Sequence, residues 1–260
     1  MCNTLAVAHY EYLMQIRRPG LWLSSVLLGS ALYLFLLRDR GAVPAYYLSE
    51  PLPWKLGANL IATFNQVMPL VAGILVADRF PRDRQLGMTA LLNTSRLSRR
   101  ALALGKYLGS LLAVLTPSLV VTAACVAYLS ITLGLPLLFL TVPVVFMVVA
   151  LPSWLFVTAW SLLFPIILPL RIYQVAFAGF WLWAVAVTPE HLPTINHSIF
   201  SVQGQYALSG FFFTGPTPFL HPQATPGWAA LNIGLLGGLT VLGLVLLPAV
   251  LRWREKRAGG

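Results

Sequence analysis

The sequence predicts an all-α membrane protein with six transmembrane helices, forming one transmembrane domain over residues 1–260. Two observations carry this prediction. Charged residues make up 9% of the chain and hydrophobic residues 58%, whereas an ordinary soluble domain has about 25% charged residues. In addition, Arg171 and Glu190 are the only formally charged residues between Tyr107 and Leu251. Such a stretch cannot cover a soluble surface with polar side chains. A soluble enzyme, a disordered tail and a disulfide-stabilised secreted domain are therefore excluded.

The first expected element is an interfacial helix over residues 4–18. Glu11, Gln15 and Arg18 follow one another at i, i+4 and i+7, so a helix would carry them as one polar stripe on an otherwise apolar surface. Pro19-Gly20 then breaks the helix and forces a change of direction. This pattern favours a helix lying in the cytoplasmic interface of the membrane. The alternative is a simple N-terminal extension of the first span.

Six apolar runs have the length of a membrane span, which is about 17–25 residues. They cover residues 21–37, 56–77, 107–134, 137–170, 172–188 and 227–251. Gly134-Leu135-Pro136 marks a turn after the third run, and the prolines beside Arg171 separate the fourth from the fifth. Pro143 and Pro152 are expected to kink the fourth span.

Lys and Arg residues orient these spans. With the N-terminus in the cytoplasm, 14 of them fall inside and three outside, and the loop over residues 189–226 has none. Because cytoplasmic loops carry an excess of Lys and Arg, we expect a multi-pass protein of the plasma (inner) membrane with both termini cytoplasmic. The net charge of +10 is then a matter of orientation, and no nucleic-acid partner is expected.

The external segment over residues 189–226 is unusually apolar for a loop. It has one charge, Glu190, yet it contains Tyr206-Ala207-Leu208 and Phe211-Phe212-Phe213. We therefore expect short helices here that are partly re-entrant, which is possible where the backbone is buried in protein. His191, His197 and His221 share the segment, but their spacing matches no metal-site pattern, so no metal site is expected.

The segment over residues 78–106 is the longest on the cytoplasmic side, with seven basic and two acidic residues. Met88, Leu91 and Leu92 would lie on one side of a short helical turn at its centre. An apolar ridge between charged flanks favours a protein partner, and a solvated basic loop is the alternative. In that alternative, Ser98 would cap the third span, and Arg99, Arg100 and Lys106 would hold lipid headgroups.

A family resemblance is carried by about 27 residues of this region. They are Asp83-Arg84, Gly87, Leu91-Leu92, Thr94 and Ser98-Arg99-Arg100, followed by Leu104-Gly105-Lys106-Tyr107-Leu108-Gly109. This pattern resembles the segment between the second and third helices of ABC type-2 exporter permeases. Ala90 departs from it, standing near the family's usual acidic residue, and Ser95 replaces the family's proline.

The resemblance implies a coupling segment that docks on a separate ATP-hydrolysing subunit. The residues it places at that contact are Arg84, Gly87, Met88, Leu91, Leu92 and Thr94. It also implies that the chain pairs with a second copy or a sister permease and binds two copies of the ATPase. ATP and Mg²⁺ would be bound by those partner subunits, and this chain would hold no cofactor of its own.

Motifs of an enzyme or of an ion-coupled carrier are missing from the sequence. Gly105-Lys106 lacks the following Ser or Thr of a Walker A motif, and neither HExxH nor GxSxG occurs. No carboxylate stands deep in an expected span, where proton- or sodium-coupled carriers usually have one. We therefore expect no catalytic residue here and an energy source outside the chain. The alternatives are an integral membrane enzyme acting on lipid through the histidine-bearing loop, and a non-transporting assembly subunit.

Two further patterns fall within the expected spans. Asn59, Thr63 and Gln66 form a polar stripe in the second span, which suits either a translocation path or hydrogen bonds between helices. Two small-residue motifs, Gly105-x-x-x-Gly109 and Gly234-x-x-x-Gly238, permit close helix packing, within one subunit or between two. Membrane lipid is the remaining expected partner.

Overall fold

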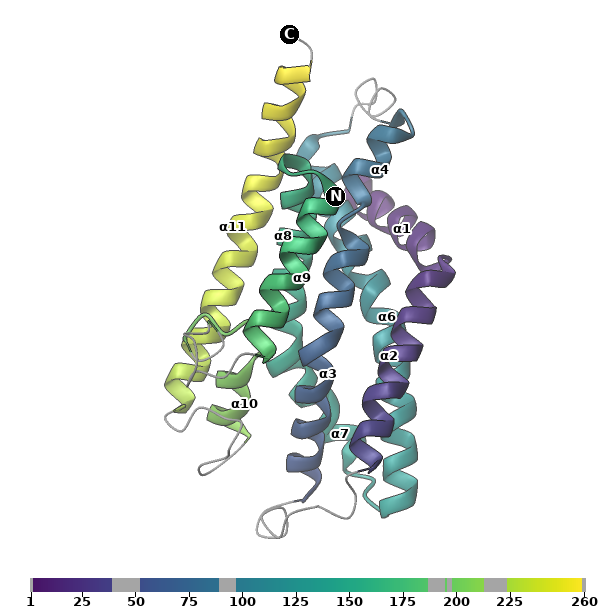
Figure 1. The fold of residues 1–260 in the computed structure, drawn as a ribbon, viewed down its shortest axis with the longest axis vertical. Helices are drawn as coiled ribbons and strands as arrows, with labels where there is room; N and C mark the ends of the chain where they lie inside the picture. Colours follow the sequence, from purple (N-terminus) through teal and green to yellow (C-terminus); the bar gives the residue numbers. More distant parts are fainter. Residues whose placement is uncertain are drawn as a thin grey trace.

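The computed structural model describes residues 2–38, 52–88, 97–186, 195, 198–212 and 224–258. Within these ranges the regular elements are helices and none is a strand, so the all-α prediction is confirmed there (Figure 1). In chain order they are α1 (Cys2–Ile16), α2 (Pro19–Arg38), α3 (Leu52–Val76), α4 (Arg79–Gln85), α6 (Arg99–Leu133), α7 (Leu138–Val145), the π-helical turn η3 (Phe146–Ala150), α8 (Leu151–Ile167), α9 (Leu170–Ala186), α10 (Gln205–Phe211) and α11 (Pro226–Ala258).

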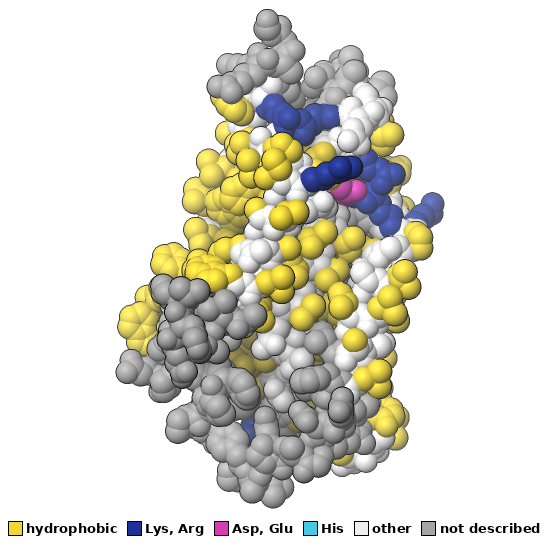
Figure 2. Space-filling model, in the orientation of Figure 1, with side chains coloured by type: hydrophobic (Ala, Val, Ile, Leu, Met, Phe, Trp, Pro, Cys, Tyr) yellow, Lys and Arg dark blue, Asp and Glu magenta, His cyan; other side chains and the backbone are white. Residues whose placement is uncertain are grey.

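The long helices run roughly along one axis and alternate in direction, whereas α1 lies obliquely across one end (Figure 1). Both ends of the chain lie toward that same end, together with α4 and the start of α6. We call it the basic end, because Figure 2 shows Lys and Arg gathered there above a largely apolar flank. The Lys and Arg residues that the sequence concentrates in a few short segments thus lie together at one end of the structure.

Within the described ranges, four stretches of helix are long and apolar enough to cross a membrane. They are Pro53–Gln85, Arg99–Leu133, Leu138–Ile167 and Pro226–Arg254, and the apolar stretch Leu170–Val185 is shorter. The expected second, third, fourth and sixth spans correspond to these four, and the expected fourth runs three residues past Ile167. The expected first and fifth form α2 and α9, of 20 and 17 residues.

Helix boundaries follow the sequence signals closely. Pro19 opens α2 after a two-residue break, and Gly134 ends α6 with φ +66°, a conformation that glycine adopts without strain. Ser98 caps α6 by accepting a hydrogen bond from the Ala101 amide at 3.2 Å. Leu168 and Pro169 separate α8 from α9. In the fourth span, η3 follows Pro143 by three residues, so the irregularity expected there is a widened π turn.

The expected short helix in the external segment is α10, whose Tyr206, Ala207 and Leu208 are buried. The loop before it is tied to two long helices. Asn65 of α3 donates its side-chain amide to the Gln203 carbonyl at 2.8 Å. Asn232 of α11 donates to the carbonyls of Ile199 (2.6 Å) and Ser201 (3.0 Å). The described part of this segment is therefore anchored in the bundle, whereas its three histidines lie outside the described residues.

Candidate functional site

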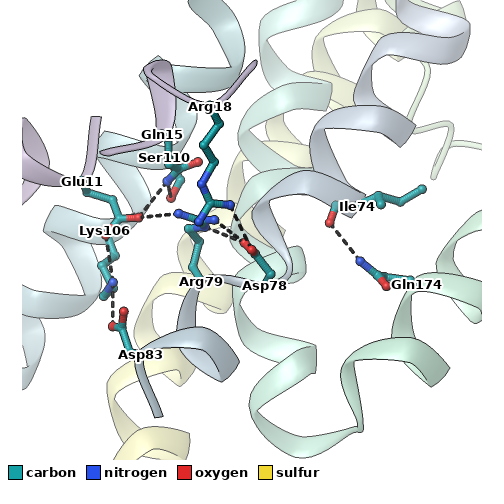
Figure 3. A network of polar contacts seen from close by, with 10 residues as sticks. All are labelled: Glu11, Gln15, Arg18, Ile74, Asp78, Arg79, Asp83, Lys106, Ser110 and Gln174. Carbon is teal, nitrogen blue, oxygen red and sulfur yellow. Dashed lines mark hydrogen bonds and ion pairs between the residues drawn. The ribbon is translucent and has the colours of Figure 1, made fainter. Parts of the chain in front are cut away.

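Six charged side chains form one connected cluster at the basic end, which we call the charge network. It comprises Arg18, Asp78, Arg79, Glu11, Lys106 and Asp83, and cations and carboxylates alternate along it (Figure 3). Three positive and three negative charges leave it formally neutral. The chain has only seven Asp and Glu residues, and three of them lie here.

Lys106 is one centre of the network. Its Nζ lies 2.8 Å from Glu11 Oε2 of α1 and 2.8 Å from Asp83 Oδ2 of α4. Its ammonium also stands 5.5 Å from the centre of the Phe80 ring, within cation–π range. Lys106 is 4% exposed and Glu11 is 2% exposed. One side chain of α6 thus holds both α1 and α4, and Lys106 does not hold lipid headgroups as the alternative of a solvated basic loop predicts.

Arg79 is the second centre, at the first residue of α4. It contacts Asp78 through two nitrogens, with Nε 2.7 Å and Nη2 2.5 Å from Oδ1, and its Nη1 lies 3.5 Å from Glu11 Oε1. Arg18 completes the chain of charges, with Nη1 2.9 Å from Asp78 Oδ2. Partial burial lowers the pKa of Arg18, and the Asp78 carboxylate counteracts this effect. An arginine remains protonated under such a shift.

Hydrogen bonds of Gln15 and close backbone packing also hold α1 against α6 beside these charges. Gln15 donates its amide to Glu11 Oε1 at 2.8 Å and to Ser110 Oγ at 2.6 Å. A Cβ on Gly105 would lie 2.6 Å from Val7, and one on Gly109 would lie 2.5 Å from the Ala8 carbonyl oxygen. Such distances are too short for any side chain, so the two glycines are what allows α1 to lie this close.

The burial of the network determines how strongly it holds. An unpaired charge in a low-dielectric site is very unfavourable, so each buried ion needs its partners to stay in place. Four elements depend on one another in this way: α1, the junction of α3 and α4, α4 itself and α6. On the neighbouring side, Gln174 of α9 donates to the Ile74 carbonyl of α3 at 3.3 Å. A displacement of α4 would therefore strain its ion pairs with α1 and α6.

Neither a family model nor a curated protein matches this sequence. The resemblance of residues 83–109 accordingly stands on that segment alone. What the structure adds to it is geometry, because Asp83 and Lys106, near its two ends, are joined by an ion pair of 2.8 Å.

The coupling residues predicted from the sequence fall into two groups. Arg84 lies in the last turn of α4, Gly87 follows the helix with φ +69°, and Met88 is 42% exposed. Leu86, which the sequence reasoning did not single out, is 65% exposed between them. The others, Leu91, Leu92 and Thr94, lie outside the described residues.

The polar stripe of α3 has a different character from the prediction. Asn59 and Thr63 are partly buried and Gln66 is exposed, and the Thr63 hydroxyl donates to the Asn59 carbonyl of its own helix at 2.9 Å. The neighbouring Asn65 is 1% exposed and lines a small cavity shared with Ser118 and Thr122 of α6. Asn65, a buried polar residue of α3, thus lies one residue before Gln66 of the predicted stripe, and the translocation path stays a prediction.

The two glycine motifs behave differently. Gly105 and Gly109 form the close contact with α1 described above, so this motif packs helices within the chain. A Cβ on Gly234 or on Gly238 would meet no atom within 4 Å. Among the described residues this motif therefore makes no close contact between helices, and packing between copies remains a prediction for it.

Proposed function

We propose that this chain is the membrane-spanning permease subunit of an ATP-driven ABC exporter. It would cross the plasma (inner) membrane six times, with α2 and α9 as the first and fifth spans and the basic end in the cytoplasm. Two such chains, or one with a sister permease, would form the translocation path, and a separate ATPase subunit would dock on each basic end.

The observation that carries this proposal is the position of α4. This short helix lies at the basic end, exposes Leu86 and Met88 just after its last turn, and is bound to α6 through Asp83 and Lys106. An exposed apolar pair beside basic side chains suits a protein partner better than water. The resemblance of residues 83–109 to the coupling segment of exporter permeases specifies that partner as an ATPase.

The charge network provides the mechanism of coupling in this proposal. When the ATPase subunits close on ATP, they would displace α4, and Asp83 and Arg79 would pull on Lys106 and Glu11. Because Arg79, Lys106 and Glu11 are buried and the Asp83 side chain is only 20% exposed, these ions would move together rather than separate. The start of α6 and the whole of α1 would follow α4, which changes the packing of the spans and alternates access to the two sides.

The proposal is tested by purifying the tagged chain from its native membrane and identifying the proteins that accompany it. We expect a P-loop ATPase, and we expect Met88→Asp to abolish its recovery, because that change buries an unpaired carboxylate at the contact. Arg17→Gln is the matched control, being an exposed position at the same end on another element. Recovery of no ATPase with the wild-type chain, or full recovery with Met88→Asp, would refute the assigned contact.

A further inference from the structure

A cavity of about 500 Å³ opens beside the charge network, between the end of α1, the start of α2, the end of α3 and α4. Its lining combines charged and apolar side chains. Arg18, Arg79 and Arg82 contribute guanidinium groups, Glu11 and Asp83 contribute carboxylates, and Met14, Leu75 and Leu86 contribute apolar side chains. A cavity with a cationic excess beside apolar side chains suits an amphipathic anion.

The charges of the cavity do not cancel. Arg18 and Arg79 are neutralised within the network by Asp78 and Glu11. Arg82 is exposed and makes no ion pair within the part of the chain that the structure describes, although Asp78 and Arg18 are near enough to interact with it electrostatically. The cavity thus offers one unmatched guanidinium, and it has two further arginines to strengthen the local field.

The position of the cavity along the helix axes indicates which kind of anion it would bind. The cavity lies where α2 and α3, both apolar, meet the basic end, and Leu21 and Leu75 of these helices are among its lining residues. A free phosphate would use only the arginine side and leave the leucines in water. A phospholipid would place its phosphate at the arginines, which bind phosphate through paired N–H groups, and its acyl chain along the leucines. Basic pockets between membrane helices bind anionic headgroups in this way.

We propose that this cavity binds an anionic phospholipid, with its headgroup phosphate on Arg82 beside Arg18 and the start of an acyl chain against Leu75 and Met14. The lipid would lie against α4 and the junction of α1 and α2. It would thereby hold the network in the arrangement described here. The proposal rests on the cavity and its charges, and it does not require the ATPase assigned above.

The test is native mass spectrometry of the purified full-length chain, titrated separately with dioleoyl-phosphatidylglycerol and dioleoyl-phosphatidylcholine. We expect tighter binding of phosphatidylglycerol by about fivefold or more, which is the effect of one basic residue on an anionic headgroup. Arg82→Gln should remove this preference. Arg84→Gln is the matched control on the same helix, since Arg84 does not line the cavity, and it should keep the preference.

Two further arms identify the source of the phosphate. Met14→Ser, at an exposed position, should weaken binding of the dioleoyl lipid more than that of glycerol 3-phosphate, because only the lipid has an acyl chain to lie against the apolar side chains. Inorganic phosphate at millimolar concentration should leave the lipid bound. Equal binding of the two lipids, an unchanged preference in Arg82→Gln, or displacement by inorganic phosphate would each overturn the assignment to an anionic lipid.

Discussion

Replacing Lys106 with leucine tests the charge network directly. The change removes the ammonium that lies 2.8 Å from both Glu11 and Asp83. Removal of one member of a buried ion pair destabilises a protein by about 3–5 kcal/mol. Glu11 keeps its hydrogen bond from Gln15 and its contact with Arg79, and Asp83 has a side chain 20% exposed to solvent. We therefore expect the lower end of that range, about 3 kcal/mol.

The assay is equilibrium unfolding in mixed detergent micelles, followed by tryptophan fluorescence and circular dichroism. Arg100→Leu is the matched control, because Arg100 is exposed on the same helix and surface changes usually stay within about 0.5 kcal/mol. The double variant with Glu11→Leu should be less destabilised than the sum of its two single variants, by about 1 kcal/mol or more. A loss below about 1 kcal/mol for Lys106→Leu, or strict additivity in the double variant, would show that the buried pair does not hold α1.

Three further predictions concern close contacts. Gly109→Ala should destabilise the chain by about 1–3 kcal/mol, because its Cβ would lie 2.5 Å from the Ala8 carbonyl oxygen. Gly238→Ala is the control, and it should leave the stability of the single chain unchanged or raise it. Equilibrium unfolding in micelles compares the two variants. Gly204→Ala should loosen the loop before α10, because φ is +73° there and the Cβ would lie 2.6 Å from the Val149 carbonyl oxygen; faster proteolysis of this loop is the measurement. Asn232→Leu leaves the carbonyls of Ile199 and Ser201 without their hydrogen-bond donor. It should therefore lower the free energy of unfolding by about 1–3 kcal/mol. An unchanged free energy of unfolding would mean that water replaces the amide.

Local features of this fold could be predicted because their causes are local. Proline and glycine restrict or free φ within one residue, so the break before Pro19 and the end of α6 at Gly134 follow from the sequence alone. The serine cap of α6 is local in the same sense. The expected number of crossings depends on counting apolar runs, and four of those runs form helices of sufficient length in the structure.

The charge network could not be predicted because its members come from distant parts of the chain. Glu11 and Lys106 are 95 residues apart, and Lys106 stands near the start of a span, where lysines commonly reach lipid headgroups. The polar stripe of Glu11 and Gln15 was visible in the sequence, but a stripe does not name the helix it faces. The glycine pair in α6 was a second signal, because Gly105-x-x-x-Gly109 indicates that another helix packs closely against α6 at the position of Lys106.

The distance in sequence between Glu11 and Lys106 also sets the order in which the protein can assemble. A ribosome adds about 5–20 residues per second, so the carboxylate of Glu11 exists for roughly 5–20 s before its lysine partner is made. During that interval, burying Glu11 without Lys106 would be electrostatically unfavourable. The polar side of α1 therefore stays in contact with water until α6 is made. Docking of α1 then becomes a late event that follows insertion of α6, and a nascent chain stopped before Lys106 should leave its first helix open to a protease.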